Sequence, residues 1–186
     1  MIYLDNSATT KPHKEVLNTF MQVNEQYYAN PASIHEAGVT ANTLLMRARE
    51  QVAQILNTEA QEVVFTAGGT ESNNFAIFGT AQASTHKGKH ILTTEIEHPS
   101  VLEAVKRLAQ AGFEVDYLHV DRNGIISLDE LRDKVRKDTI LVSIMHVNNE
   151  MGAIQPIEEA AKIIHANSRA LFHVDAVQSF GKLPVA

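Results

Sequence analysis

The chain has 186 residues, of which 44% are hydrophobic and 20% charged, enough for one ordinary globular domain with a proper core. Its net charge of −6 argues against nucleic acid or an anionic membrane as a partner, and no apolar run is long enough to span a bilayer. Cysteine is absent, which excludes disulfides, thiolate metal sites and a cysteine nucleophile within these residues.

The first eleven residues predict an irregular arm, because Asp5 to Thr10 is turn chemistry with little to bury. The extreme N-terminus has no basic segment followed by an apolar one, so it is not expected to be a signal peptide. A cytoplasmic location is the resulting expectation. Residues 12–186 are expected to form the domain proper.

Two helices are predicted next. Pro12 suits the first turn of an amphipathic helix, which should end before Asn30-Pro31 because the residue before a proline avoids the α region. A longer helix is predicted from Ser33 or His35 to Leu56, and Asn57-Thr58 ends it. The residues expected to face inward from this second helix are Leu44, Leu45, Ala48, Val52, Ile55 and Leu56.

From there the pattern alternates between strand and helix. Strands are predicted near residues 62–66, 90–94, 113–118, 139–145 and 170–174, and helices near 70–83, 99–111, 127–136 and 156–167. The strands are mostly apolar throughout, which favours an α/β fold with a mostly parallel sheet flanked by helices. No closing helix follows the last strand, so the fold is expected to be incomplete at its C-terminus.

A glycine-rich turn joins the first of these strands to its helix. Gly68 and Gly69 allow close backbone approach, and Thr70 can add a hydroxyl donor at a helix N-terminus, which suits an anion such as phosphate. The alternative is an ordinary strand–turn–helix joint in which Thr70 only caps the helix.

Three further loops carry polar residues just after predicted strands, where ligands bind in open α/β sheets. His98 precedes Pro99 at a helix start, so it is either an N-terminal cap or an imidazole that stacks on a flat ring and moves a proton. Asn148 and Asn149 either complete a turn or face a ligand.

Asp175 directly follows the last predicted strand, where a buried carboxylate needs a partner. A protonated ring nitrogen would supply one, and Gln178 could reach the same ligand. A flat, phosphorylated heteroaromatic with a cationic ring nitrogen describes pyridoxal phosphate, whose usual protein partners are a Schiff-base lysine and an aspartate at the pyridinium nitrogen.

Taken together, six segments resemble the cysteine desulfurases of the NifS/IscS type, which belong to the class V aminotransferase group with the fold-type-I architecture of pyridoxal phosphate enzymes. The segments follow the family's order and spread over essentially the whole chain. They are residues 3–10 (YLDNSATT), 30–35 (NPASIH), 69–74 (GTESNN), 97–98 (EH), 146–152 (HVNNEMG) and 173–179 (HVDAVQS).

The resemblance implies a role for each matching residue. Gly69 and Thr70 correspond to the phosphate-binding turn, and His98 to the histidine that stacks on the cofactor ring and handles substrate protons. Asp175 corresponds to the aspartate paired with the pyridine nitrogen. Asn149 and Gln178 correspond to side chains near the phenolic oxygen of the ring.

The reaction implied by the resemblance removes sulfur from L-cysteine and gives L-alanine. The sulfur becomes an enzyme-bound persulfide and passes to a sulfur-accepting or iron–sulfur scaffold protein, for iron–sulfur cluster or thio-cofactor assembly. The resemblance also implies a homodimer, and it assigns residues 1–11 to the side of a smaller domain.

Three family residues have no match in the sequence. The Schiff-base lysine belongs to a Ser-Gly-His-Lys-like segment beyond Gln178, and Lys182 matches a non-catalytic position instead. The persulfide cysteine and the usual substrate-carboxylate arginine also lie further downstream in the family. These residues therefore correspond to about the first half of such an enzyme, and this fragment alone is expected to be inactive.

Three alternatives remain open from the sequence: a selenocysteine lyase, a different class V aminotransferase, and a non-catalytic scaffold that keeps the fold. No metal is expected, because none of the nine histidines forms a ligand pair on one helix face.

Overall fold

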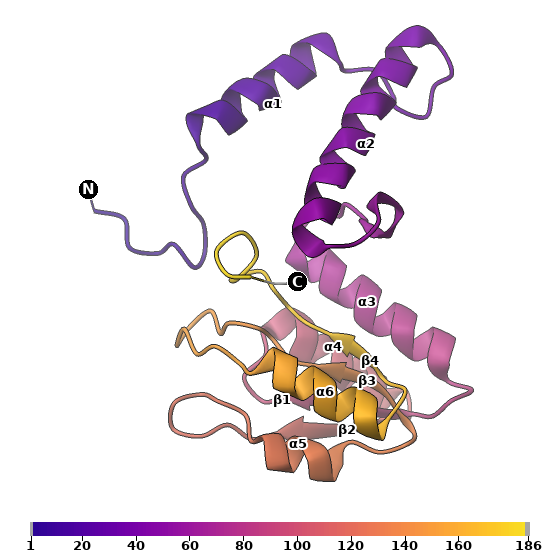
Figure 1. The fold of residues 1–186 in the computed structure, drawn as a ribbon, viewed down its shortest axis with the longest axis vertical. Helices are drawn as coiled ribbons and strands as arrows, with labels where there is room; N and C mark the ends of the chain where they lie inside the picture. The colour runs from indigo at the N-terminus through magenta and orange to yellow at the C-terminus, as the bar shows by residue number, and fades with distance from the viewer. Residues whose placement is uncertain (1, 185–186) are drawn as a thin grey trace. The chain divides into compact units, whose positions relative to one another are not determined.

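The computed structural model describes residues 2–184, which form two compact units, residues 2–65 and residues 66–184 (Figure 1). None of the helices in this described part is long and apolar enough to cross a membrane.

The first unit is helical. It contains α1 (Lys14–Gln26), α2 (Glu36–Leu56) and the short 3-10 helix η1 (Ala60–Glu62), so both predicted helices are confirmed. The ring of His35 caps α2 by accepting a hydrogen bond from the Gly38 amide, and Asn57 ends the helix in the left-handed conformation.

The apolar faces of these helices are less buried than their periodicity predicts. No residue of α1 is buried, and Phe20 is 64% exposed. On α2 the buried side chains include Ala41 and Ala53, and the assignment of Ile55 as an inward residue is wrong because 53% of it is exposed. Within residues 2–65, α2 packs mainly against the short η1, which covers only part of its surface.

The strand predicted at residues 62–66 is also wrong. Glu62 ends η1, and Val63, Val64 and Phe65 continue without pairing to any strand among the described residues. Val63 is buried, but Val64 is 60% exposed. A strand needs a neighbour to satisfy its backbone groups, and an apolar run alone does not provide one.

The second unit alternates helix and strand as predicted, and its element ends lie within two residues of the predicted ones. Its elements are α3 (Gly69–Ser84), β1 (His90–Thr94), α4 (Pro99–Gln110), β2 (Glu114–Leu118), α5 (Leu128–Lys134), β3 (Thr139–Ser143), α6 (Ile157–Asn167) and β4 (Leu171–His173).

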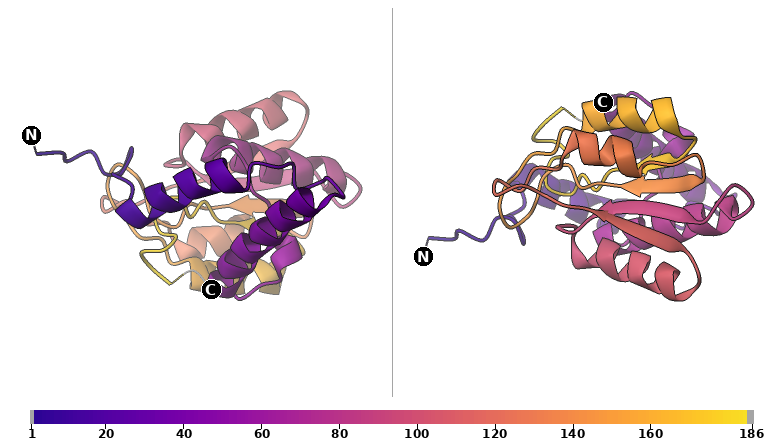
Figure 2. Two further views of the ribbon diagram at one scale, coloured as in Figure 1. Left: turned by 90° about the horizontal axis from the view of Figure 1, so that it is seen from above. Right: turned by 90° about the horizontal axis from the view of Figure 1, so that it is seen from below.

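The four strands form a parallel sheet in the order β2-β1-β3-β4, with α3 and α4 on one face and α5 and α6 on the other (Figures 1 and 2). Successive side chains of a strand point to opposite faces. Ile91 and Leu141 therefore pack with α3 and α4, whereas their neighbours Leu92 and Val142 pack with α5 and α6. The predicted parallel sheet with helices on both faces is confirmed.

This strand order places a topological switch between β1 and β3, because the chain leaves β1 toward β2 and then returns to the other side of β1. Loops that leave two such neighbouring strands diverge, and the crevice between them is where ligands bind in open α/β sheets. The polar loops after β1, β3 and β4 therefore lie at the edge of the sheet that can hold a ligand.

The close approach of two turns at the opposite edge predicts a large effect of one methyl group. A Cβ on Gly88 would overlap the backbone carbonyl of Asp138, so Gly88→Ala is expected to lower the free energy of unfolding by about 1–3 kcal/mol. Gly79→Ala is the matched control, because a Cβ there meets nothing within 4 Å and alanine favours the α3 helix. Urea unfolding of both variants measures the difference, and equal stability of the two would contradict the packing described here.

Candidate cofactor site

The N-terminus of α3 presents free backbone donors. Its N-cap is Gly68, which has no side chain to cap the helix, and no described residue accepts a hydrogen bond from the amides of Gly69, Thr70 or Glu71. Thr70 is the second helical residue, so the interpretation of Thr70 as the cap is wrong. Three free N–H groups, the positive end of the helix dipole and the Thr70 hydroxyl make this helix start a candidate anion site.

His98 begins α4 on the neighbouring loop. Its Nδ1 accepts a hydrogen bond from the Ser100 amide at 3.1 Å and lies 2.8 Å from the Ser100 hydroxyl. The capping role is therefore confirmed. The ring is nevertheless exposed, and its Nε2 makes no hydrogen bond with a described residue. Capping through one nitrogen leaves the ring face and the other nitrogen available to a ligand.

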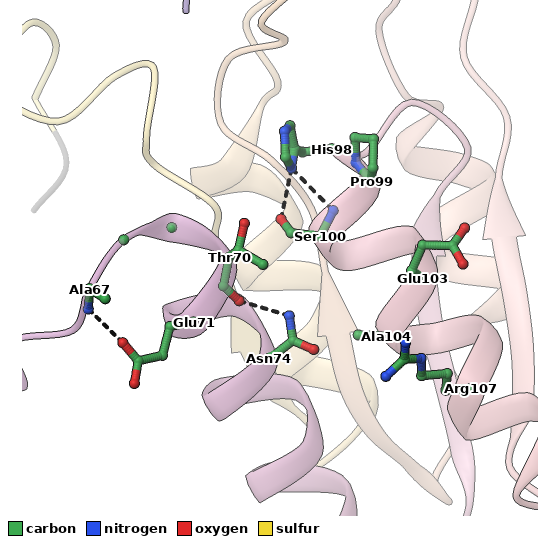
Figure 3. A pocket seen from close by; sticks show the side chains of 12 residues that line it. Ala67, Thr70, Glu71, Asn74, His98, Pro99, Ser100, Glu103, Ala104 and Arg107 are labelled. Atoms are coloured by element: carbon green, nitrogen blue, oxygen red, sulfur yellow. Dashed lines mark hydrogen bonds between the residues drawn. The ribbon is translucent and has the colours of Figure 1, made fainter. Parts of the chain in front are cut away.

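These two helix starts line one open pocket of about 830 Å³ (Figure 3). Thr70 at the start of α3 and His98 and Ser100 at the start of α4 all contribute to its lining. Arg107 lines the pocket further along α4.

Asp175 lies on the loop just after β4 and is only 7% exposed. Its Oδ2 accepts a hydrogen bond from the Asn73 side chain at 2.8 Å, and its Oδ1 accepts one from the Val177 amide at 3.0 Å. The turn that follows returns to the α3 terminus, where a Cβ on Gly69 would lie 3.1 Å from Val177 Cγ2. The carboxylate is thus oriented by protein donors, and each oxygen keeps a further lone pair for a ligand.

The other two predicted residues, Asn149 and Gln178, lie on the loops after β3 and β4. Asn148 fixes the loop after β3, since its Oδ1 accepts from the amides of Glu150 and Met151 and its Nδ2 donates to the Ile96 carbonyl. That turn leaves the side chain of Asn149 half-buried and without a hydrogen bond to a described residue. Gln178 is half-buried in the turn after β4. Neither of the two predicted residues lines the pocket.

Glu97 is a functional candidate that the sequence left without a role. It is 4% exposed, and its Oε1 accepts hydrogen bonds from the Thr94 hydroxyl at 2.7 Å and the Met145 amide at 2.8 Å. These contacts tie the end of β1 to the end of β3 at the switch point. Its Oε2 is buried without a partner among the described residues. Burial, assisted by the charge of Asp175, raises the pKa of this carboxyl to about 7, although its hydrogen bonds oppose the shift.

Asn73 and Ser100 are two further buried polar residues that the sequence reasoning did not single out. Asn73 lies one helical turn after Thr70, so it occupies the same face of α3 as the anion site. That spacing was the available signal. No group of three His, Cys, Asp or Glu side chains placed to hold a metal ion is found in the described part of the chain.

Comparison with known proteins identifies relatives of this chain. A family profile described as "Aminotransferase class-V" matches residues 2–186. A protein named "Cysteine desulfurase IscS" from Dictyoglomus turgidum is 47% identical over 184 residues, which are 99% of this chain and 46% of the relative. A protein of the same name from Methanosarcina thermophila is 48% identical over 184 residues, which are 99% of this chain and 45% of that relative. The chain spans about half the length of the curated relatives it matches.

Solved structures of similar proteins have the same fold. A structure titled "NifS-like protein" superposes with a TM-score of 0.96 at 42% identity, covering all of this chain and 51% of the other. A second, titled "SspA in complex with cysteine", superposes with a TM-score of 0.94 at 37% identity and is 53% covered. The sheet and flanking helices are thus those of the large domain of fold-type-I pyridoxal phosphate enzymes, and the fold is incomplete within this chain.

Proposed function

This chain belongs to the class V aminotransferase family, and on that premise we propose that the complete protein is a pyridoxal phosphate-dependent cysteine desulfurase. The observation that carries the proposal is the arrangement of an uncapped helix N-terminus, an exposed histidine and a buried aspartate around one edge of a parallel sheet. The names of relatives more than 40% identical to the chain support L-cysteine as the substrate.

The residues present fit the cofactor. The free amides at the start of α3 and the Thr70 hydroxyl would hold its phosphate. Asp175, already oriented by Asn73, would hold the proton on its ring nitrogen. His98 would cover the ring face, and Asn149 and Gln178 would contact its phenolic edge, as the family resemblance implies.

Bound pyridoxal phosphate supplies an electron sink for breaking bonds at the substrate amino acid. The chain's own residues bind and orient the reactants. Gly69 and Thr70 would bind the phosphate, and Asp175 would keep the ring nitrogen protonated. His98 lines the pocket and is exposed, so its Nε2 can move a proton to or from the substrate.

The proposal extends to parts of the protein beyond these residues. We assign the lysine that anchors the cofactor and the cysteine that receives the sulfur to the remaining half of the length, since the relatives are about twice as long as this chain. The sulfur would leave as a persulfide for a sulfur-accepting or iron–sulfur scaffold protein. A homodimer in the cytoplasm, devoted to iron–sulfur cluster or thio-cofactor assembly, completes the proposed function.

The test is the stoichiometry of products from the complete gene product incubated with L-cysteine and a reductant. The proposal predicts one alanine for each sulfide released. Alanine formed only from L-selenocysteine would indicate a selenocysteine lyase instead of a cysteine desulfurase. Transamination without sulfide would indicate another class V aminotransferase, and failure to retain the cofactor would indicate a scaffold.

The uncapped helix start predicts a trade between stability and cofactor affinity. A Cβ at Gly68 meets nothing within 4 Å, so Gly68→Asp places a carboxylate over the free amides of α3. We expect the free energy of unfolding to rise by about 0.3 kcal/mol, because the carboxylate caps the helix. We expect the affinity for pyridoxal phosphate to fall about tenfold, because the same carboxylate competes with the phosphate.

The affinity is measured by titrating the cofactor-free complete protein with pyridoxal phosphate. Gly68→Ala is the matched control, since it adds the Cβ without the charge. Equal affinities of the two variants for pyridoxal phosphate would show that its phosphate does not bind at the start of α3.

A further inference from the structure

Asn73 connects the aspartate and the histidine of the site. It is 4% exposed on α3, and its Nδ2 donates to Asp175 Oδ2 at 2.8 Å and to Ser100 Oγ at 2.9 Å. Both amide hydrogens are therefore used. The opposite orientation of the amide would place its oxygen against the Asp175 carboxylate, so the network itself fixes which atom is the donor.

The same donor-to-acceptor direction continues from Asn73 through the Ser100 hydroxyl to the ring of His98. Because Ser100 Oγ accepts from Asn73, its own hydrogen is free to donate, and His98 Nδ1 lies 2.8 Å away. The Ser100 amide donates to the same nitrogen at 3.1 Å. Nδ1 thus accepts from two donors and has no place for a proton of its own.

We propose that Asn73 is a positioning residue that sets the tautomer of His98, holding the neutral ring with its proton on Nε2, and that couples this ring to Asp175 through Ser100. The inference deepens the proposed function and rests on it for its consequence in catalysis. The consequence is directional: His98 enters the reaction as a proton donor through Nε2, since Nδ1 is occupied by the two Ser100 donors (Figure 3).

The same chain of bonds links the two ends of the cofactor cradle. A change in the position of the Asp175 carboxylate moves the Asn73 amide, and this alters the donor that Ser100 presents to His98. Asp175 lies on the loop after β4, Asn73 on α3 and Ser100 on α4, so the network joins three parts of the chain at this edge of the sheet. Such networks act as units and rigidify the groups they join.

The test reads the tautomer directly. Histidine side chains of the cofactor-free complete protein are labelled with ¹⁵N, and long-range ¹H–¹⁵N correlation spectra are recorded for wild type, Asn73→Ala and Ser100→Ala; His98→Gln assigns the signals. The wild-type ring is expected to show an unprotonated, hydrogen-bonded Nδ1 and a protonated Nε2. In Ser100→Ala the Nδ1 resonance is expected to move downfield, toward that of an imine nitrogen with fewer donors.

In Asn73→Ala the Ser100 hydroxyl loses the donor that fixes its orientation, so it can turn and accept a hydrogen bond from a protonated Nδ1 in competition with the Ser100 amide, and both tautomers of His98 are expected. Asn74→Ala is the matched control, because among the described residues that side chain donates only to the Thr70 carbonyl of its own helix. A wild-type proton on Nδ1, or unchanged His98 signals in both network variants, would overturn the proposal. If Asn73→Ala fails to fold, Ser100→Ala decides alone.

The catalytic consequence has its own readout. Loss of one neutral hydrogen bond in the network is expected to lower kcat for alanine formation about 3- to 10-fold in Ser100→Ala, with KM little changed. The spectra need neither cofactor nor turnover, so a protein that shows the predicted tautomer but no desulfurase activity would refute the proposed function and leave the tautomer assignment standing. An unchanged kcat with an altered tautomer would overturn the role in catalysis.

Discussion

Replacing Asp175 by asparagine is expected to lower kcat for alanine formation about 10²- to 10³-fold in the complete protein, the range found when one preorganised electrostatic contact is removed from an active site. The substitution keeps the size of the side chain but removes its charge. An asparagine cannot hold a proton on the cofactor's ring nitrogen, and it cannot accept from both Asn73 and Val177 through two equivalent oxygens.

Asp133→Asn is the matched control, because Asp133 is exposed on α5 and forms no ion pair with a described residue. Circular dichroism and thermal unfolding establish that both variants fold. An Asp175→Asn variant that is folded and within about threefold of wild-type activity would contradict the assignment of this carboxylate, since electrostatic contacts of this kind contribute far more.

Replacing Glu97 by glutamine is expected to remove part of the pH dependence of the free energy of unfolding. The pKa of this carboxyl rises from 4.5 to about 7 on folding, chiefly because of burial. Between these two pH values the folded state binds more protons than the unfolded state, so stability falls as pH rises. Integrated over that interval, the loss is about 3 kcal/mol. Below pH 4.5 the carboxyl is protonated in both states, so its burial no longer lowers the free energy of unfolding of the wild type.

Glutamine does not titrate, and it keeps an oxygen for the Thr94 hydroxyl and the Met145 amide. The free energy of unfolding of Glu97→Gln relative to wild type is therefore expected to increase by about 3 kcal/mol from pH 4.5 to pH 8. Urea unfolding at several pH values measures it. Glu50→Gln, at an exposed position of α2, provides the control. A difference that stays constant with pH would show that Glu97 ionises as an ordinary carboxyl.

The sequence predicted the second unit well, because its signals are local. Apolar runs and proline positions placed every helix and strand of residues 66–184, and the position of Asp175 after a buried strand predicted a carboxylate in need of a partner. The strand at residues 62–66 was wrong because pairing is not a local property. The amphipathic pattern of α1 predicted a helix, but it could not indicate how much of the apolar face would be covered.

The buried hydrogen-bond network could not be predicted for the same reason. Asn73 bonds Ser100 across 27 residues and Asp175 across 102, and Glu97 bonds Met145 across 48. Only the folded sheet edge brings these groups together. His98 was ambiguous between a cap and a ligand contact, and the structure resolves the ambiguity by using one ring nitrogen for the cap and leaving the other free.

The most direct test of the central claim, that these loops form most of a pyridoxal phosphate cradle, is the intact mass of the complete gene product after incubation with pyridoxal phosphate and reduction with borohydride. We predict one reduced cofactor per chain, attached to a lysine beyond Ala186. Absence of a specific adduct would contradict the cofactor assignment, and an adduct on Lys182 would contradict the placement of the anchoring lysine.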